Sequence, residues 1–228
     1  MNGVVIVAAG SGSRMNMGMN KQFIKLRDKE IIAYTIEKFY NHKNINEIVV
    51  VIKEEEVNFF KEEILSKYGF RKVKIAFGGK ERQDSVYNGL KMLSDDCDIV
   101  LIHDGARPFI SEKIIDNCIE EAKNYNAVVV GVPVKDTIKV INEENDIVDT
   151  PERSKLWAVQ TPQTFNYDIL VKSYEDAFKN NFYGTDDAML VERIGYKVKM
   201  IKGSYNNIKI TTQEDLSIGI QILKDENH

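Results

Sequence analysis

Cysteine and histidine are scarce in this chain, and their scarcity excludes several classes of protein. The 228 residues include two cysteines, Cys97 and Cys118, and three histidines. The cysteines lie in a strand approach and a helical segment, so they indicate no disulfide framework, and we expect a cytoplasmic location. They form no metal-binding cluster, and no cysteine or histidine stands out as a catalytic nucleophile.

Long apolar runs and an excess of basic residues are also missing. No apolar run approaches the length of a membrane span, and the N-terminal residues lead directly into a strand without the pattern of a secretory signal. The 31 Lys and Arg against 35 Asp and Glu give a formal net charge of −4, which argues against nucleic acid as a partner. A small anionic substrate stays compatible with this charge, because local basic residues can act inside a pocket.

The hydrophobic pattern predicts one large α/β domain over residues 1–228. A hydrophobic content of 43% suffices for a sizeable core. Continuous apolar runs alternate with segments of helical periodicity, which predicts a Rossmann-like, mostly parallel sheet with helices on both faces. The expected strands are 4–9, 48–52, 73–77, 99–103, 127–132 and 197–201, and the expected helices are 31–40, 57–68, 85–93, 114–123, 167–178, 186–194 and 214–223.

A hairpin with few apolar residues interrupts this alternation between Asp136 and Trp157. Two short strand-like stretches flank the polar turn at 142–145. Because an isolated hairpin is marginal in water, we expect this protruding arm, about residues 136–157, to lie on its own domain or on a partner subunit.

The first apolar run ends in a glycine-rich turn that carries two cations. Gly10-Ser11-Gly12-Ser13-Arg14-Met15 follows the strand directly, and Lys21 comes seven residues after Arg14. A strand that ends in such a turn presents backbone N–H groups at one edge of a sheet, where they can hold phosphate. The guanidinium and the ammonium would stabilise charge that develops on a polyphosphate.

The spacing within this turn separates three kinds of phosphate loop. The distance from Gly10 to Lys21 does not fit a P-loop, and Met15 stands where a dinucleotide fingerprint needs its third glycine. The pattern Gly-x-Gly-x-Arg-Met followed by Lys is typical of nucleotidyltransferases, although Asn20 stands where they often have proline. An ordinary strand-to-loop turn, with glycine used for backbone freedom, is the competing interpretation.

Polar segments follow three other predicted strands, at 78–85, 103–108 and 133–137. Ligands of open parallel sheets bind beyond the carboxyl ends of the strands, so these segments should meet the Gly10 turn. Asp104 is suited to hold Mg²⁺ there, or it caps the next segment or pairs with Arg107. For Arg107, a phosphate clamp and a pair with Asp104 both stay open, and we interpret His103 as a packed residue.

Three weaker candidates have simpler explanations. From the sequence alone, Gly79 and Ser85 are a plain turn and a helix N-cap, and Thr185 is the cap of the helix that follows it. Lys209 lies in an expected short strand before the last helix, where an inward lysine would need an anion.

The chain resembles one family over nearly its whole length. Its motifs, in order, are similar to those of the 2-C-methyl-D-erythritol 4-phosphate cytidylyltransferases of the non-mevalonate isoprenoid pathway. The resemblance implies transfer of CMP from CTP to methylerythritol 4-phosphate, release of pyrophosphate, and Mg²⁺ or another divalent cation as cofactor. It is carried by Ala8-Ala9-Gly10, Arg14-Met15, Lys21-Gln22, Asp84-Ser85, residues 103–108, Asp136-Thr137, residues 160–163, residues 185–188 and residues 207–211.

The resemblance also implies roles for individual residues. In the family the hairpin arm crosses to a second subunit, so two arm residues would reach the neighbour's site in a homodimer with shared active sites. The attacking phosphate oxygen is ionised at neutral pH and needs no general base. The implied catalytic residues are Arg14, Lys21 and Lys209, the nucleotide contacts are Ala8, Ala9, Gly10, Gly12, Ser13, Gly79, Ser85, Gly105 and Thr185, the metal ligand is Asp104, and the sugar-phosphate contacts are Arg107, Thr137 and Arg153.

Two alternative functions stay open at this point. A cytidylyltransferase that acts on ribitol 5-phosphate shares most of these motifs, but Ala9 and residues 185–188 favour methylerythritol phosphate. A nucleotide-binding regulator without turnover is the non-enzyme alternative. Arg14 and Lys21 argue against it, because a sensor has no need of charges that stabilise a transition state.

Overall fold

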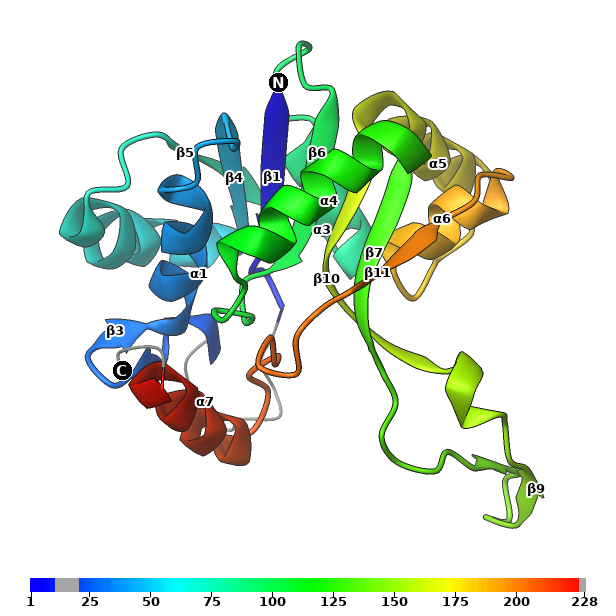
Figure 1. The fold of residues 1–228 in the computed structure, drawn as a ribbon. Coiled ribbons are helices and arrows are strands. Elements are labelled where there is room, and N and C mark those ends of the chain that lie inside the picture. Colours follow the sequence, from blue (N-terminus) through cyan, green and yellow to red (C-terminus); the bar gives the residue numbers. More distant parts are fainter. Residues whose placement is uncertain (11–20, 226–228) are drawn as a thin grey trace.

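Seven strands form the main sheet of the computed structural model, which describes residues 1–10 and 21–225. The strand order is β11-β7-β10-β6-β1-β4-β5 (Figure 1), and only β10 runs antiparallel to its neighbours. The predicted mostly parallel α/β sheet is therefore confirmed. The strands are β1 (Asn2–Val7), β4 (Glu47–Ile52), β5 (Val73–Phe77), β6 (Ile99–Asp104), β7 (Ala127–Pro133), β10 (Trp157–Asn166) and β11 (Lys199–Lys202).

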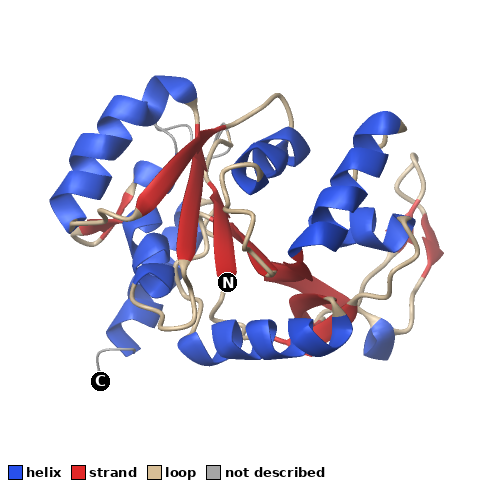
Figure 2. Cartoon of the chain, turned by 90° about the horizontal axis from the view of Figure 1, so that it is seen from above, coloured by secondary structure: helices blue, strands red, loops and turns tan. Residues whose placement is uncertain are grey.

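Helices cover both faces of this sheet, as Figure 2 shows from above. One helical stretch is irregular, because α2 (Val57–Phe59) continues as the π-helix η4 (Phe60–Ser66) where the sequence predicts one helix. The expected helix at 85–93 begins earlier, at Arg82. The other helices are α1 (Ile31–Tyr40), α3 (Arg82–Leu90), α4 (Glu112–Tyr125), α5 (Tyr167–Lys179), α6 (Asp187–Arg193) and α7 (Gln213–Asp225), with short helices η2 (Lys21–Phe23), η3 (Glu54–Glu56) and η5 (Arg153–Lys155).

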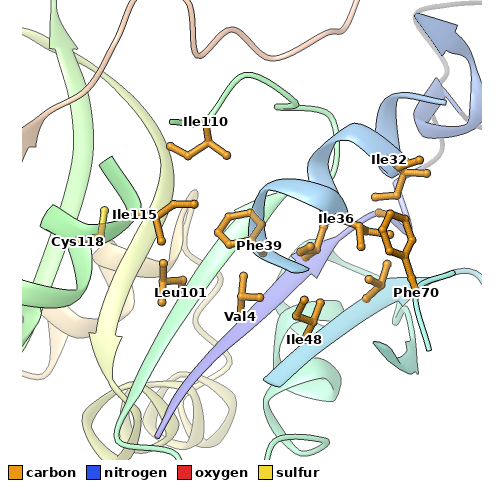
Figure 3. Close-up of a cluster of buried hydrophobic side chains, with 14 of the residues drawn as sticks. Val4, Ile32, Ile36, Phe39, Ile48, Phe70, Leu101, Ile110, Ile115 and Cys118 are labelled. Atoms are coloured by element: carbon orange, nitrogen blue, oxygen red, sulfur yellow. The ribbon is translucent and has the colours of Figure 1, made fainter. Parts of the chain in front are cut away.

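Successive apolar side chains of the central strands point to opposite faces of the sheet, and each face has its own hydrophobic core. Val4 and Ile6 of β1 pack with α1 and α4 on one face, whereas Val5 packs with α3, α5 and α6 on the other. Figure 3 shows the first core, with Ile36 and Phe39 of α1 over the strands. Because both faces are buried, the central strands hold their carboxyl ends, and the polar residues that follow them, in fixed positions.

The arm extends away from the sheet (Figure 1). Its short strands β8 (Val140–Ile141) and β9 (Ile147–Asp149) pair antiparallel, so the predicted hairpin is confirmed. Residues 135–150 are exposed throughout, and Ile147 is 62% exposed. The arm therefore makes no core with its own chain. A second small hairpin, β2 (Lys25–Leu26) and β3 (Lys29–Glu30), precedes α1.

Strand β10 is the strand of the main sheet that the sequence interpretation missed. It follows the arm and inserts between β6 and β7, with a register shift between Val159 and Gln163. Polar residues such as Gln160 and Thr161 are buried here, so no hydrophobic alternation marks the strand, and Pro162 further weakens the pattern. Among the described residues, no helix is both long enough and apolar enough to cross a membrane.

Candidate active site

A cavity of about 340 Å³ lies at the carboxyl ends of β1 and β6. It brings together residues from the Gly10 turn, from the turn after β5, from the end of β6 and from the segment before α7. The convergence expected from strand-end geometry is therefore present for segments 78–85 and 103–108, whereas no residue of segment 133–137 lines the cavity. The predicted site residues that line it are Ala9, Gly10, Gly79, Ser85, Asp104 and Lys209.

Asp104, the last residue of β6, is a buried carboxylate surrounded by cations. Its Oδ2 lies 3.0 Å from Lys209 Nζ and 3.4 Å from Arg107 Nε. Burial alone would raise the pKa of Asp104, but Lys209, Arg82 and Arg107 outweigh burial and hold this pKa well below its usual range. The carboxylate is therefore ionised at neutral pH, and Lys209 has the anion that an inward lysine needs.

A chain of hydrogen bonds fixes the backbone at Asp104. The Asp104 N–H donates to Thr161 Oγ1 at 3.0 Å, and this hydroxyl lies 3.1 Å from Nδ1 of the fully buried His103. His103 Nε2 donates to the Arg107 carbonyl at 3.0 Å. Burial lowers the pKa of His103 to about 4, so the ring is neutral at pH 7. His103 is thus a packed residue bonded to backbone, in agreement with its sequence interpretation.

Lys209 and Arg107 are held by the segment that precedes α7. Arg107 Nη1 donates to the Asn207 carbonyl at 2.8 Å, and the buried Asn207 side chain donates to Thr161 O at 2.9 Å. The prediction of a short strand at Lys209 is wrong. Residues 207–210 form no strand, and their backbone is anchored by the Ile210 N–H, which donates to Ala106 O at 2.9 Å.

The turn after β5 is built around Ser85. The Gly79 N–H donates to Ser85 Oγ at 3.1 Å, and this hydroxyl donates to Glu81 O at 3.1 Å. A Cβ on Gly79 would lie 2.2 Å from Asp84 Cβ, so this turn admits only glycine. The N-cap assignment of Ser85 is wrong, because Glu81 is the N-cap of α3 and Ser85 lies inside the helix.

Thr185 is exposed and does not line the cavity. Its prediction as a helix cap is also wrong, because the Asp186 side chain caps α6 by accepting from the Met189 N–H at 3.0 Å. A carboxylate one residue along the chain outcompetes the hydroxyl for this position.

Thr137 and Arg153 lie on the exposed arm, away from the Asp104 cavity of their own chain. Arg153 Nη1 donates to Lys135 O at 3.0 Å, within the arm itself. Gly105 follows Asp104 but does not line the cavity; a Cβ there would meet Ile32 Cδ1 at 2.8 Å. Ala8 is buried at the end of β1 and does not line the cavity either. Gly12, Ser13 and Arg14 lie outside the described residues, and so does the side chain of Lys21.

Six residues that line the cavity had no role predicted from the sequence: Val7, Gln22, Lys80, Glu81, Arg82 and Ala106. Lys80 and Arg82 come from the polar segment at 78–85, whose basic residues were the available signal. Gln22 is 3% exposed, and its Oε1 has no hydrogen-bond partner within the described part of the chain. A buried acceptor left unsatisfied at a cavity is suited to a ligand donor.

The sequences of known proteins match this chain over nearly its whole length. The family model for 2-C-methyl-D-erythritol 4-phosphate cytidylyltransferase (IspD) matches residues 3–225. The enzyme of that name from Clostridioides difficile (strain 630) is 63% identical, over 99% of this chain and 95% of that protein. The one from Alkaliphilus oremlandii (strain OhILAs) is 53% identical, over 97% and 94%.

A solved structure is similar in fold as well. It is the 4-diphosphocytidyl-2C-methyl-D-erythritol synthase from Anaerococcus prevotii DSM 20548, which aligns with a TM-score of 0.87 at 34% sequence identity. The alignment covers 98% of this chain and 96% of that one, so it includes the arm as well as the sheet.

Proposed function

The chain belongs to the 2-C-methyl-D-erythritol 4-phosphate cytidylyltransferase family, and we infer that it transfers CMP from CTP to 2-C-methyl-D-erythritol 4-phosphate. The products are CDP-methylerythritol and pyrophosphate, and the chain is a nucleotidyltransferase. One observation in the fold carries this conclusion: the Gly10 turn, the Gly79 turn and the Asp104–Lys209 pair all meet at one cavity. The proposed reaction needs backbone donors for phosphate, a turn that contacts the base and an ionised carboxylate, and Gly10, Gly79 and Asp104 would belong to these three parts.

Mg²⁺ or another divalent cation is the proposed cofactor, and Asp104 is its proposed ligand. Mg²⁺ usually keeps several waters and takes one or two protein carboxylates together with phosphate oxygens. No group of three His, Cys, Asp or Glu side chains suited to a metal occurs among residues 1–10 and 21–225, so a site with one carboxylate is the kind that fits. When bound, the cation would offset negative charge on the phosphate oxygens.

The proposed mechanism places the work of this chain in positioning and charge stabilisation. The sugar phosphate attacks the α-phosphorus of CTP in line, and its oxygen is ionised without a base. Arg14 and Lys21 would stabilise the five-coordinate phosphorus and the leaving pyrophosphate. Lys209, held 3.0 Å from Asp104, would line the phosphate site and contribute positive charge there.

A homodimer with shared active sites is proposed from the arm. Thr137 and Arg153 are far from contact with the cavity of their own chain, and the arm exposes Ile138 and Ile147. Packing on a twofold-related copy would bury these side chains and deliver both polar residues to the partner's cavity, where they would hold the sugar phosphate together with that subunit's Arg107. A cytoplasmic location is proposed with it.

One assay tests the substrate assignment. The purified protein with CTP and Mg²⁺ is offered methylerythritol 4-phosphate and ribitol 5-phosphate in separate reactions, and pyrophosphate release is measured. We expect release with methylerythritol 4-phosphate. Faster release with ribitol 5-phosphate would reassign the acceptor, and CTP binding without release on either compound would make the chain a regulator.

A further inference from the structure

An ion pair between the half-buried Arg82 and the buried Asp187 joins α3 to α6 beside the cavity. Arg82 Nη1 and Nη2 donate to the two carboxylate oxygens of Asp187, at 3.0 and 2.7 Å. Asp187 is 1% exposed and also accepts from the hydroxyl of Tyr174 on α5. Arg82 is the member of this group that lines the cavity. The pair thus connects the cavity wall to two helices on the same face of the sheet.

The neighbouring residue makes a second connection between the same segments. Gln83 Nε2 donates to Phe182 O, and Gln83 Oε1 accepts from the Gly184 N–H, both at 3.1 Å. From the sheet side, the side chain of Gln163 contacts Asp186 Oδ2 at 2.9 Å and the Ala188 N–H at 3.0 Å. Residues 182–187, here called the Thr185 turn, are therefore held on both sides.

These contacts link two parts of the proposed nucleotide site. Arg82 and Gln83 belong to the base turn, residues 78–85, in which Gly79 and Ser85 would read the cytosine. The Thr185 turn carries Thr185, which the resemblance implies is a nucleotide contact and which is exposed outside the Asp104 cavity. The two turns are about 100 residues apart in the chain, since Arg82 and Asp187 are separated by 105 positions. Their relative position therefore depends on side-chain contacts such as this pair.

We propose that the Arg82–Asp187 pair, completed by Tyr174, is a positioning device that holds the base turn and the Thr185 turn at the separation that CTP requires. The inference rests on the proposed function and names positioning residues for it. Arg82 acts here through the turns, because each of its terminal nitrogens donates one hydrogen bond to Asp187 and the guanidinium is thereby fixed to α6. An ion pair of fixed, bidentate geometry is suited to set a distance between two loops.

The test compares Asp187→Asn and Arg82→Lys with wild type in steady-state kinetics. Asp187→Asn removes the charge, and Arg82→Lys keeps the charge but loses the two-pronged geometry. We expect KM for CTP to rise about tenfold in each, with KM for the sugar phosphate and kcat changed less than about threefold. Calorimetry supplies a second readout, the ratio of the Kd for cytidine to the Kd for CTP. This ratio should decrease in the variants, because the base and the triphosphate would no longer be bound at the same time.

A control ion pair lies on the same face of the sheet and shares helix α6. Asp176 of α5 pairs with Arg193 of α6 at 3.0 Å, and both side chains are about one-third exposed. Asp176→Asn makes the same chemical change at an ion pair of α6 away from the cavity, and should leave both KM values unchanged. A purely structural role for Asp187 would instead lower the active fraction, and thus kcat, at a constant KM for CTP.

Each outcome decides the question. If Asp187→Asn fails to fold, Tyr174→Phe keeps the ion pair but removes the hydroxyl contact, and it should raise KM for CTP by about threefold. An unchanged KM for CTP in Arg82→Lys and Tyr174→Phe would overturn the inference. Wild-type protein without turnover of CTP would overturn the proposed function instead, which keeps the two failures distinct.

Discussion

At the scale of single residues, the proposed chemistry depends on the cationic side chains that surround one carboxylate, that of Asp104. Asp104 is visible in the sequence because it ends an apolar run, and its position at the cavity follows from strand-end geometry. The pair with Arg107, three residues away, was one of the alternatives that the sequence offered. Lys209 was predicted to need an anion, but Asp104 could not be named as that anion, because Lys209 and Arg82 come from distant segments that only the fold brings together.

The first prediction concerns Lys21. Its charge is proposed to act mainly in the transition state, so Lys21→Ala should lower kcat by about 10²–10³ while KM for CTP rises far less. Steady-state kinetics with CTP varied at saturating sugar phosphate measure both constants. A variant with near-normal kcat would remove Lys21 from the mechanism.

The second prediction concerns His103 and pH. Burial lowers the pKa of His103 to about 4, against about 6.5 for the imidazole in an unfolded chain. As pH falls from 6.5 towards 4, the unfolded state binds a proton that the folded state does not, so stability decreases over this window. The full effect of such a shift is about 3 kcal/mol.

Denaturant unfolding of wild type and His103→Asn between pH 7 and pH 4.5 measures this effect. The variant should be less stable at pH 7 because it loses contacts with Thr161 and the Arg107 carbonyl. Its stability should nevertheless fall less steeply with pH, since the titrating ring is gone. Parallel pH profiles for the two proteins would show that His103 does not drive the loss.

At the scale of secondary-structure elements, apolar periodicity predicted the elements with continuous cores and failed where polar residues are buried. The sequence predicted four such elements correctly, because their buried residues are nearly all aliphatic or aromatic: strands β1 and β4 and helices α1 and α4. Strand β10 buries the polar residues Gln160 and Thr161. Its sequence therefore lacks the alternation of apolar and polar residues and resembles that of a loop. The caps of α3 and α6 were misplaced because acidic residues, Glu81 and Asp186, take positions assigned to Ser85 and Thr185.

The third prediction belongs to the base turn. Gly79 and Ser85 form a tight turn in which backbone groups can read one edge of a base. A site that hydrogen-bonds the amino group of cytosine rejects uracil, because its acceptors would be left without a donor. We expect kcat/KM for CTP to exceed that for UTP, ATP and GTP by at least about 10². Equal turnover of CTP and UTP would show that this turn does not read the base.

At the scale of the whole molecule, the arm is the feature that one chain cannot explain. The sequence predicted the hairpin and its lack of a core, because apolar residues are sparse between Asp136 and Trp157. It could not locate the surface that receives the arm, since that depends on the shape of a folded partner. In the structure, Ile138, Val140 and Ile147 are 40, 43 and 62% exposed, and the proposed packing on a second copy would bury these side chains.

The fourth prediction tests the shared site by complementation. Arg153→Ala subunits lack the arm residue proposed to reach across, and Lys21→Ala subunits lack the charge in the cavity, so each homodimer should be inactive. A mixed dimer contains one site built from the intact cavity of the first subunit and the intact arm of the second. With equal amounts and random exchange, about half of the dimers are mixed, and activity should return to about a quarter of wild type.

Subunit exchange is verified first, with differently tagged subunits purified in sequence. An inactive mixture can then not be explained by a failure of the subunits to exchange. The mixture is compared with each variant alone at the same total protein concentration, because dilution of a dimer would lower activity in every sample. Recovery would place Arg153 at the partner's cavity. If the exchanged mixture stays as inactive as its components, Arg153 acts within its own chain, and the arm then serves association without completing the site.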